Sequence, residues 1–231
     1  MFEQVIMSND QAKMALDAAR HLAAEGKFQD ALEKHIWYHD HALEVDQGQY
    51  GVRLSFALAD WIELGGKYPP ALNALLEIRD RKTSRLLAGE AGRELFHDVM
   101  SINERFGEHA ATVGLFKKID VMQPQFAEEI YDLADEALIT AGEYALAKKY
   151  LGDAGRRFEI AKSNFVECLE YSETSQFRDM SRRTAEMIFA GDVVRIVTVL
   201  DKTGDFAVAR EIQAKALVVL DNPAIRNAIH D

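Results

Sequence analysis

The sequence predicts an all-α protein built as a stack of helical hairpins, because two short patterns recur and helix breakers are scarce. A glycine is followed two positions later by an aromatic residue or histidine at five places: Gly26/Phe28, Gly66/Tyr68, Gly107/His109, Gly142/Tyr144 and Gly204/Phe206. A small residue stands five positions after each glycine: Ala31, Ala71, Thr112, Ala147 and Ala209. Only 4 prolines occur in 231 residues, which favours helix throughout. Recurrence at this scale is typical of helical repeat architectures.

Each of these glycines is expected to form the elbow between two helices, because glycine readily adopts the left-handed conformation that ends a helix. The positions eight and four residues before them share one helical face. They are apolar with the exception of Asn103: Ala18, Leu58, Val99, Ala134, Ile196, Leu22, Ile62, Leu138 and Leu200. The small residue after each elbow lets the second helix approach the first closely.

In chain order, the pattern predicts one domain over residues 1–231. Its expected units cover about 9–46, 51–83, 91–124 and 125–154, then an extra helical pair over 155–190, a last unit over 191–223 and an end segment over 224–231. In the extra pair we expect a helix over 155–171 and a polar break over 172–176. A second helix over 177–190 either runs into the last unit or breaks just before it.

The best repeats are LAAEGKFQDALEKH at 22–35, LADWIELGGKYPPALNALLEI at 58–78 and VLDKTGDFAVAREIQAKALVVLDNP at 199–223. In these segments the chain resembles the tetratricopeptide-repeat family, over nearly its whole length. The resemblance implies a right-handed α-α superhelix whose concave groove binds another protein or peptide. The glycine spacings of 40, 41, 35 and 62 depart from the family period of about 34. The stretch from Ala31 to Trp61 also resembles a group of uncharacterised bacterial repeat proteins.

Composition narrows the expected class of function. The formal charge of -11 argues against nucleic acid and against anionic membrane surfaces, since both require clustered Lys and Arg. Cys168 is the only cysteine, and we expect it to be a buried, inert thiol in a reducing compartment. No signal peptide or membrane-spanning run is evident. We therefore expect a cytoplasmic protein, and no sequence pattern indicates a cofactor.

The run HIWYHDH is a candidate metal site. His35 and His39 are four residues apart and share a helical face, so they could act as two ligands, whereas His41 falls on the opposite side. Zinc would need further ligands from another helix. The alternative is a packed histidine, because His35 occupies the inward-facing slot that holds Leu75 in another unit.

Arg53 lies in an apolar stretch, GVRLSFALADW, and must find a partner or water. One interpretation places it on the open face of its helix, solvated or salt-bridged. The other makes it an anchor for a carboxylate of a partner.

The resemblance also implies that the first helix of each hairpin lines the groove. The positions that this projection selects as a partner-binding groove are Lys13, Arg20, Arg53, Phe56, Asp60, Glu63, His97, Glu104, Arg105, Asp132 and Glu136. The start of the groove is basic and its middle is acidic. This split predicts a partner segment with an acidic or carboxylate end over the first units and basic residues farther on.

The most economical function is therefore a non-enzymatic protein-interaction scaffold. No nucleophile elbow or phosphate-binding glycine loop is present in the sequence. One alternative is a metal-binding protein or enzyme that uses His35 and His39. Another is a self-associating structural module, whose partner is a second copy of the chain.

Overall fold

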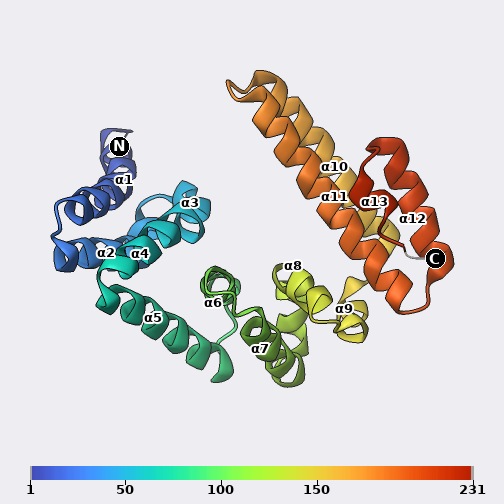
Figure 1. The fold of residues 1–231 in the computed structure, drawn as a ribbon, viewed down its shortest axis with the longest axis horizontal. Coiled ribbons are helices and arrows are strands. Elements are labelled where there is room, and N and C mark those ends of the chain that lie inside the picture. Colours follow the sequence, from blue (N-terminus) through green and yellow to red (C-terminus); the bar gives the residue numbers. More distant parts are fainter. Residues whose placement is uncertain (1, 230–231) are drawn as a thin grey trace. The chain divides into compact units, whose positions relative to one another are not determined.

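The structure is a computed structural model that describes residues 2–229, with side chains from residue 11 onward. Every regular element in these residues is helical (Figure 1), comprising thirteen α-helices and one 3-10 turn, and they include no strand. The predicted all-α class is confirmed.

The helices fall into two compact units, Met1–Ile130 and Tyr131–Asp231, which we name the N-terminal and C-terminal units. The first contains α1 (Phe2–Ala24), α2 (Phe28–Val45), η1 (Gln47–Gln49), α3 (Tyr50–Leu54), α4 (Phe56–Lys67), α5 (Pro69–Leu87), α6 (Arg93–Arg105) and α7 (His109–Met122). The division falls within α8 (Pro124–Thr140). The second unit continues with α9 (Tyr144–Leu151), α10 (Ala154–Thr174), α11 (Arg178–Lys202), α12 (Phe206–Val219) and α13 (Pro223–Arg226). The single domain expected over 1–231 stays a prediction.

Four of the five glycine elbows form as predicted. Gly26, Gly107, Gly142 and Gly204 have φ of 76°, 69°, 75° and 89° at the end of a helix. In each, the amide after the glycine donates to the carbonyl five residues earlier, as in Lys27 N to Leu22 O at 2.9 Å. This is the bond of a Schellman cap, which satisfies a carbonyl that the helix end leaves open.

The elbow predicted at Gly66 is wrong. Gly66 lies inside α4, and the chain turns two residues later at Tyr68, whose φ of -139° and ψ of 90° leave the helical region. Pro69 then begins α5. Proline suits the first helical position because its φ is already close to helical and its missing N–H would have no partner there.

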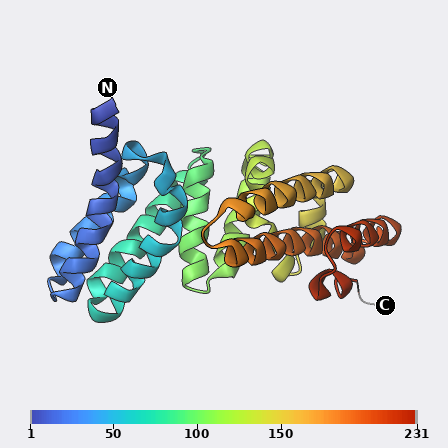
Figure 2. The ribbon, with the colours of Figure 1, turned by 90° about the horizontal axis from the view of Figure 1, so that it is seen from above.

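The helices on either side of an elbow pack against each other, as Figure 1 and Figure 2 show for α1 and α2. Ala31, Ala71, Ala147 and Ala209 are completely buried. The two polar exceptions to the apolar pattern, Asn103 and Thr112, are also buried and bond to each other, Nδ2 to Oγ1, at 3.1 Å. This bond satisfies the amide nitrogen of Asn103, whereas its Oδ1 has no hydrogen-bond partner.

Residues 155–190 form two long helices. α10 matches the helix predicted over 155–171, but α11 runs without interruption through Gly191 to Lys202, so the first of the two alternatives is confirmed. The pair packs through Phe158, Phe165 and Phe189, with the rings of the last two 4.8 Å apart. Cys168 is exposed, so its predicted burial is wrong. Along the sequence of α10, this exposed residue stands between Phe165 and Ser172, which are both buried.

Candidate functional site

The N-terminal unit contains a cavity of about 730 Å³ between α2, α3, α5 and α6. Its charged residues form two layers. The buried layer, here called the floor, consists of His39, Arg53, Lys82 and Asp98. The exposed layer, here called the rim, consists of Asp40, Glu44, Arg85, Glu90, Arg93 and Glu94.

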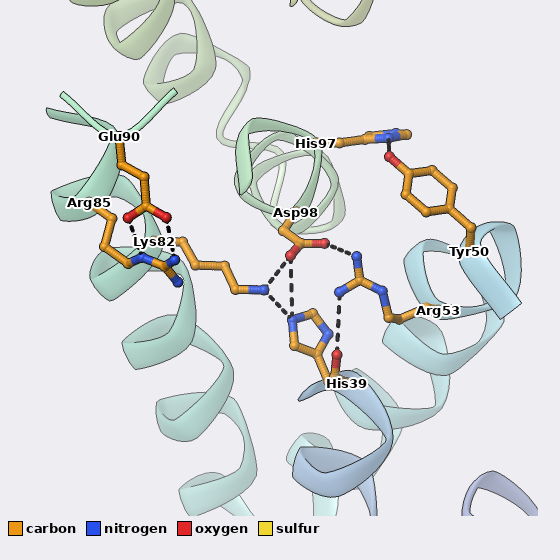
Figure 3. Close-up of polar contacts among 8 residues, drawn as sticks. All are labelled: His39, Tyr50, Arg53, Lys82, Arg85, Glu90, His97 and Asp98. Atoms are coloured by element: carbon orange, nitrogen blue, oxygen red, sulfur yellow. Dashed lines mark hydrogen bonds and ion pairs between the residues drawn. The ribbon is translucent and has the colours of Figure 1, made fainter. Parts of the chain in front are cut away.

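Asp98 is the centre of the floor (Figure 3). Its Oδ1 lies 2.6 Å from Arg53 Nη2, and its Oδ2 binds Lys82 Nζ. Lys82 Nζ also donates to His39 Nε2 at 3.0 Å, so this imidazole acts as an acceptor there. Four helices, α2, α3, α5 and α6, thus place a histidine, two cations and a carboxylate within one buried network.

A local break in the chain brings Arg53 to this position. Asp46 caps the 3-10 turn by accepting from Gly48 N at 2.9 Å, and the five-residue α3 follows. Ser55 then interrupts the helix with φ of -118° and ψ of -85° before α4 begins. Because α3 and α4 are separate helices, the face of Arg53 cannot be extrapolated from that of α4.

Burial and charge oppose each other at the floor. Burial would raise the pKa of Asp98, but Lys82 and Arg53 outweigh it, and the pKa lies below its ordinary value. Burial lowers the pKa of Lys82 despite Asp98. Burial, aided by Lys82, lowers the pKa of His39 to about 3, so His39 is neutral near pH 7.

The floor contains more cationic groups than carboxylates. Two cations, Arg53 and Lys82, face the single carboxylate of Asp98, which leaves a net charge of +1 beside neutral His39. Arg53 is only 3% exposed, its Nη1 reaches His39 O at a long 3.4 Å, and its Nε has no hydrogen-bond partner. An unsatisfied buried donor of this kind is costly and calls for an acceptor.

The rim has the opposite sign, with two arginines and four carboxylates. Arg85 Nε is bound to Glu90 Oε2 at 2.7 Å, and Arg93 Nη1 donates to the Glu129 carbonyl at 2.6 Å. The exposed carboxylates of Asp40, Glu44 and Glu94 make the entrance acidic. The cavity is therefore cationic at its base and anionic at its entrance.

Arg53 differs most from the predicted groove. The groove projection placed it beside Phe56 on one exposed helical face, and one interpretation left it on the open face of its helix. The structure buries Arg53 against Asp98, while Phe56 is 66% exposed. The break at Ser55 accounts for the difference, and the first carboxylate that Arg53 meets belongs to its own chain.

The other N-terminal groove residues have mixed surroundings. Lys13, Glu104 and Arg105 are exposed, and Arg105 donates to the Ser55 carbonyl at 3.2 Å. Arg20 and Asp60, predicted as separate groove charges, bind each other at 2.7 Å.

Three further groove positions also have neighbours. Glu63 is exposed and pairs with Lys67 at 3.0 Å. His97 Nδ1 lies 2.7 Å from Tyr50 Oη, next to the floor (Figure 3). Asp132 and Glu136 belong to the C-terminal unit, where Glu136 lies 3.6 Å from Arg195.

The histidine pair packs mainly against an aromatic ring. His35 is 1% exposed and stacks on Trp61, with ring centroids 5.6 Å apart, which confirms its inward-facing slot. His39 meets the edge of the same ring at 6.0 Å. Burial lowers the pKa of His35 to about 4. Within the described residues, His, Cys, Asp and Glu form no group of three or more that could hold a metal ion.

Sequence reasoning missed Lys82 and Asp98, although each left a signal. Lys82 continues the buried stripe of Leu75, Ile78 and Leu86 along α5. Asp98 stands between the buried Phe96 and Val99 on α6. A charged residue on an otherwise buried stripe needs a partner, and two such residues on successive helices could have been paired.

No protein-family model matches the chain, and no curated protein matches it in sequence. Within residues 2–229, no helix is both long and apolar enough to cross a membrane. The geometry of the site therefore has to support the functional argument.

Proposed function

We propose that this chain is a non-enzymatic protein-interaction scaffold, a tetratricopeptide-like superhelix of hairpins. In this proposal the N-terminal unit binds a segment of a partner protein, and a carboxylate of that segment enters the cavity. The observation that carries the proposal is the unpartnered, buried Nε of Arg53 at the cationic floor of an open cavity.

The chemistry of the floor supports a carboxylate. A guanidinium N–H forms a charge-assisted hydrogen bond to a carboxylate oxygen, which is stronger than a neutral one. In Arg53, Nη2 faces Asp98 and Nη1 reaches the His39 carbonyl, so Nε–H is the donor left for an incoming carboxylate oxygen. The incoming charge would also offset the excess positive charge of Arg53 and Lys82.

The alternative of a metal-binding protein or enzyme at His35 and His39 has weaker support. Both rings lie against Trp61, and His39 Nε2 already accepts from Lys82. The two histidines therefore do not present a pair of free ligand nitrogens toward the cavity entrance.

The direct test is a screen of an immobilised peptide library that contains acidic residues and free C-termini. Wild-type chain is compared with Arg53→Met, which keeps most of the side-chain volume, and with Arg79→Met as a control. Arg79 lies in the same unit but pairs with Glu108 at 2.6 Å. We expect peptides retained by wild type to bind Arg53→Met at least about 30-fold more weakly, since losing a buried charge partner costs 2 kcal/mol or more.

Circular dichroism establishes whether each variant is folded, and light scattering shows whether the chain binds itself instead. If Arg53→Met does not fold, competition of wild-type binding by sodium acetate, with sodium chloride at equal ionic strength as control, tests the same carboxylate site. Retention of no peptide, or equal retention by wild type and a folded Arg53→Met, would contradict the proposal. Acetate that competes no better than chloride would do the same.

A further inference from the structure

The two layers of the cavity specify more than a carboxylate. We infer that the cavity recognises a basic α-amino acid unit, with its carboxylate at the floor and its side-chain cation at the rim. This unit is either a free amino acid or the C-terminal residue of a partner segment. The inference rests on the proposed function, because it names the end of the segment that the cavity binds.

The position of the anion follows from unsatisfied donors. Arg53 is 3% exposed, lines the cavity and has a buried Nε without a hydrogen-bond partner, and Lys82 has three donor hydrogens for the two acceptors that it contacts. Both residues line the cavity, so the excess positive charge of the floor lies beside the space that a ligand would enter. A ligand carboxylate would supply the missing acceptors.

The position of the cation follows from the rim. Glu94 is one helical turn before Asp98 on α6, and both residues line the cavity. Four residues of helix span roughly 6 Å, which is comparable with the four-carbon stem of a lysine side chain. Asp40 and Glu44 add two exposed carboxylates from α2, the helix that also carries His39.

The opposite polarity of the two layers gives selectivity. A ligand with two anionic groups would meet the rim carboxylates, and a purely cationic ligand would meet Arg53 and Lys82 at the floor. Juxtaposed like charges discriminate against wrong partners more strongly than matched charges add affinity. Only a ligand that is anionic at one end and cationic about one side-chain length away suits both layers.

Isothermal titration of the full chain tests this with three acetylated hexapeptides that differ at the last residue. One ends in arginine with a free carboxylate, one in arginine amide and one in norleucine with a free carboxylate. We expect the first to bind at least tenfold more tightly than either of the others. Titration with free L-arginine distinguishes a small-molecule ligand from a protein terminus. Agmatine, which is arginine without its carboxylate, is the control.

Glu94→Gln should reduce the preference for arginine over norleucine at least threefold. Glu77→Gln, an exposed position on α5 outside the cavity, should leave the preference unchanged. Equal binding of the free and amidated peptides, or of the arginine and norleucine peptides, would overturn this inference. The proposed function would survive that result if acidic library peptides still required Arg53. Failure of every library peptide would instead reject the proposed function, and L-arginine binding without any peptide would assign the cavity to the free amino acid.

Discussion

The two units of this chain bury different kinds of side chain. Of the ten buried polar residues among the described side chains, eight lie in the N-terminal unit and only Ser172 and Asp201 in the C-terminal unit. The α10–α11 pair instead packs three phenylalanines, and its neighbouring ion pair between Arg195 and Asp135 is partly exposed. Helical hairpins thus hold together with either kind of core, so the buried charges of the N-terminal unit need a reason beyond stability.

The largest expected effect comes from removing the centre of the floor. Asp98→Ala leaves Arg53 and Lys82 buried without their carboxylate, and breaking a buried charge network typically costs 3–5 kcal/mol. Both tryptophans of the chain, Trp37 and Trp61, lie in the N-terminal unit, so their fluorescence in urea reports its unfolding.

The matched variant in the C-terminal unit is Asp192→Ala, which removes a partly exposed partner of Arg195. Solvent-accessible ion pairs contribute about 0–1 kcal/mol to stability, so we expect this variant to lose at most that much. Hydrogen exchange of the α11 amides measures the loss. Equal losses for the two variants would remove the contrast between the units.

Acidification should change the stability of the two units in opposite directions. Burial lowers the pKa of His35 to about 4 and that of His39 to about 3, whereas an unfolded histidine titrates near 6.5. The stability that these neutral rings contribute is present above pH 6.5 and is lost as the pH falls toward 4. At pH 5 the loss is about 2 kcal/mol for each histidine.

Burial has the opposite consequence for Asp135, because it raises the pKa of this carboxyl to about 6, although Arg195 opposes the shift. Its contribution is full below about pH 3.8 and is lost as the pH rises through 6. From pH 7 to 5 the C-terminal unit should therefore gain about 1 kcal/mol.

Peptide-resolved hydrogen exchange at pH 7 and pH 5, corrected for the intrinsic rates, measures both units together. His39→Gln should weaken the acid sensitivity of the N-terminal unit, whereas His109→Gln, at an exposed residue of α7, should keep it. A loss of protection in both units at pH 5 would show that acidification destabilises both, contrary to this prediction.

Neighbouring glycines give a further contrast, within a single helix. A Cβ at Gly65 would collide with the side chain of Leu72, so Gly65→Ala should cost about 1–3 kcal/mol. A Cβ at Gly66 meets no atom within 4 Å, and Gly66→Ala should stabilise α4 by about 0.5–1 kcal/mol.

Gly191→Ala extends the comparison to the C-terminal unit. Its nearest new neighbour is Arg195 Nη1 at an ordinary 3.6 Å, so a similar stabilisation is expected in α11. Thermal unfolding of the three alanine variants ranks their stabilities. Destabilisation by Gly66→Ala would show that this position needs its glycine.

The helical class, four of the elbows and the helix boundaries around them could be predicted from the sequence, because a Schellman cap depends on local residues. Gly66 has the same sequence pattern as the other four elbows, but the turn lies at Tyr68, directly before Pro69, which begins α5. The site depended on longer-range structure. The break at Ser55 rotates Arg53 inward, and its partner Asp98 comes from a helix 45 residues away in the chain, which no local period indicates.

The continuity of α11 has a consequence for engineering and for evolution. A repeat array can usually lose a terminal hairpin because each hairpin has its own two helices. Here one 25-residue rod, roughly 37 Å long, serves both α10 and α12. Cutting the chain near Gly191 would leave two half-hairpins, so residues 154–219 should be inherited, truncated or transplanted only as a whole.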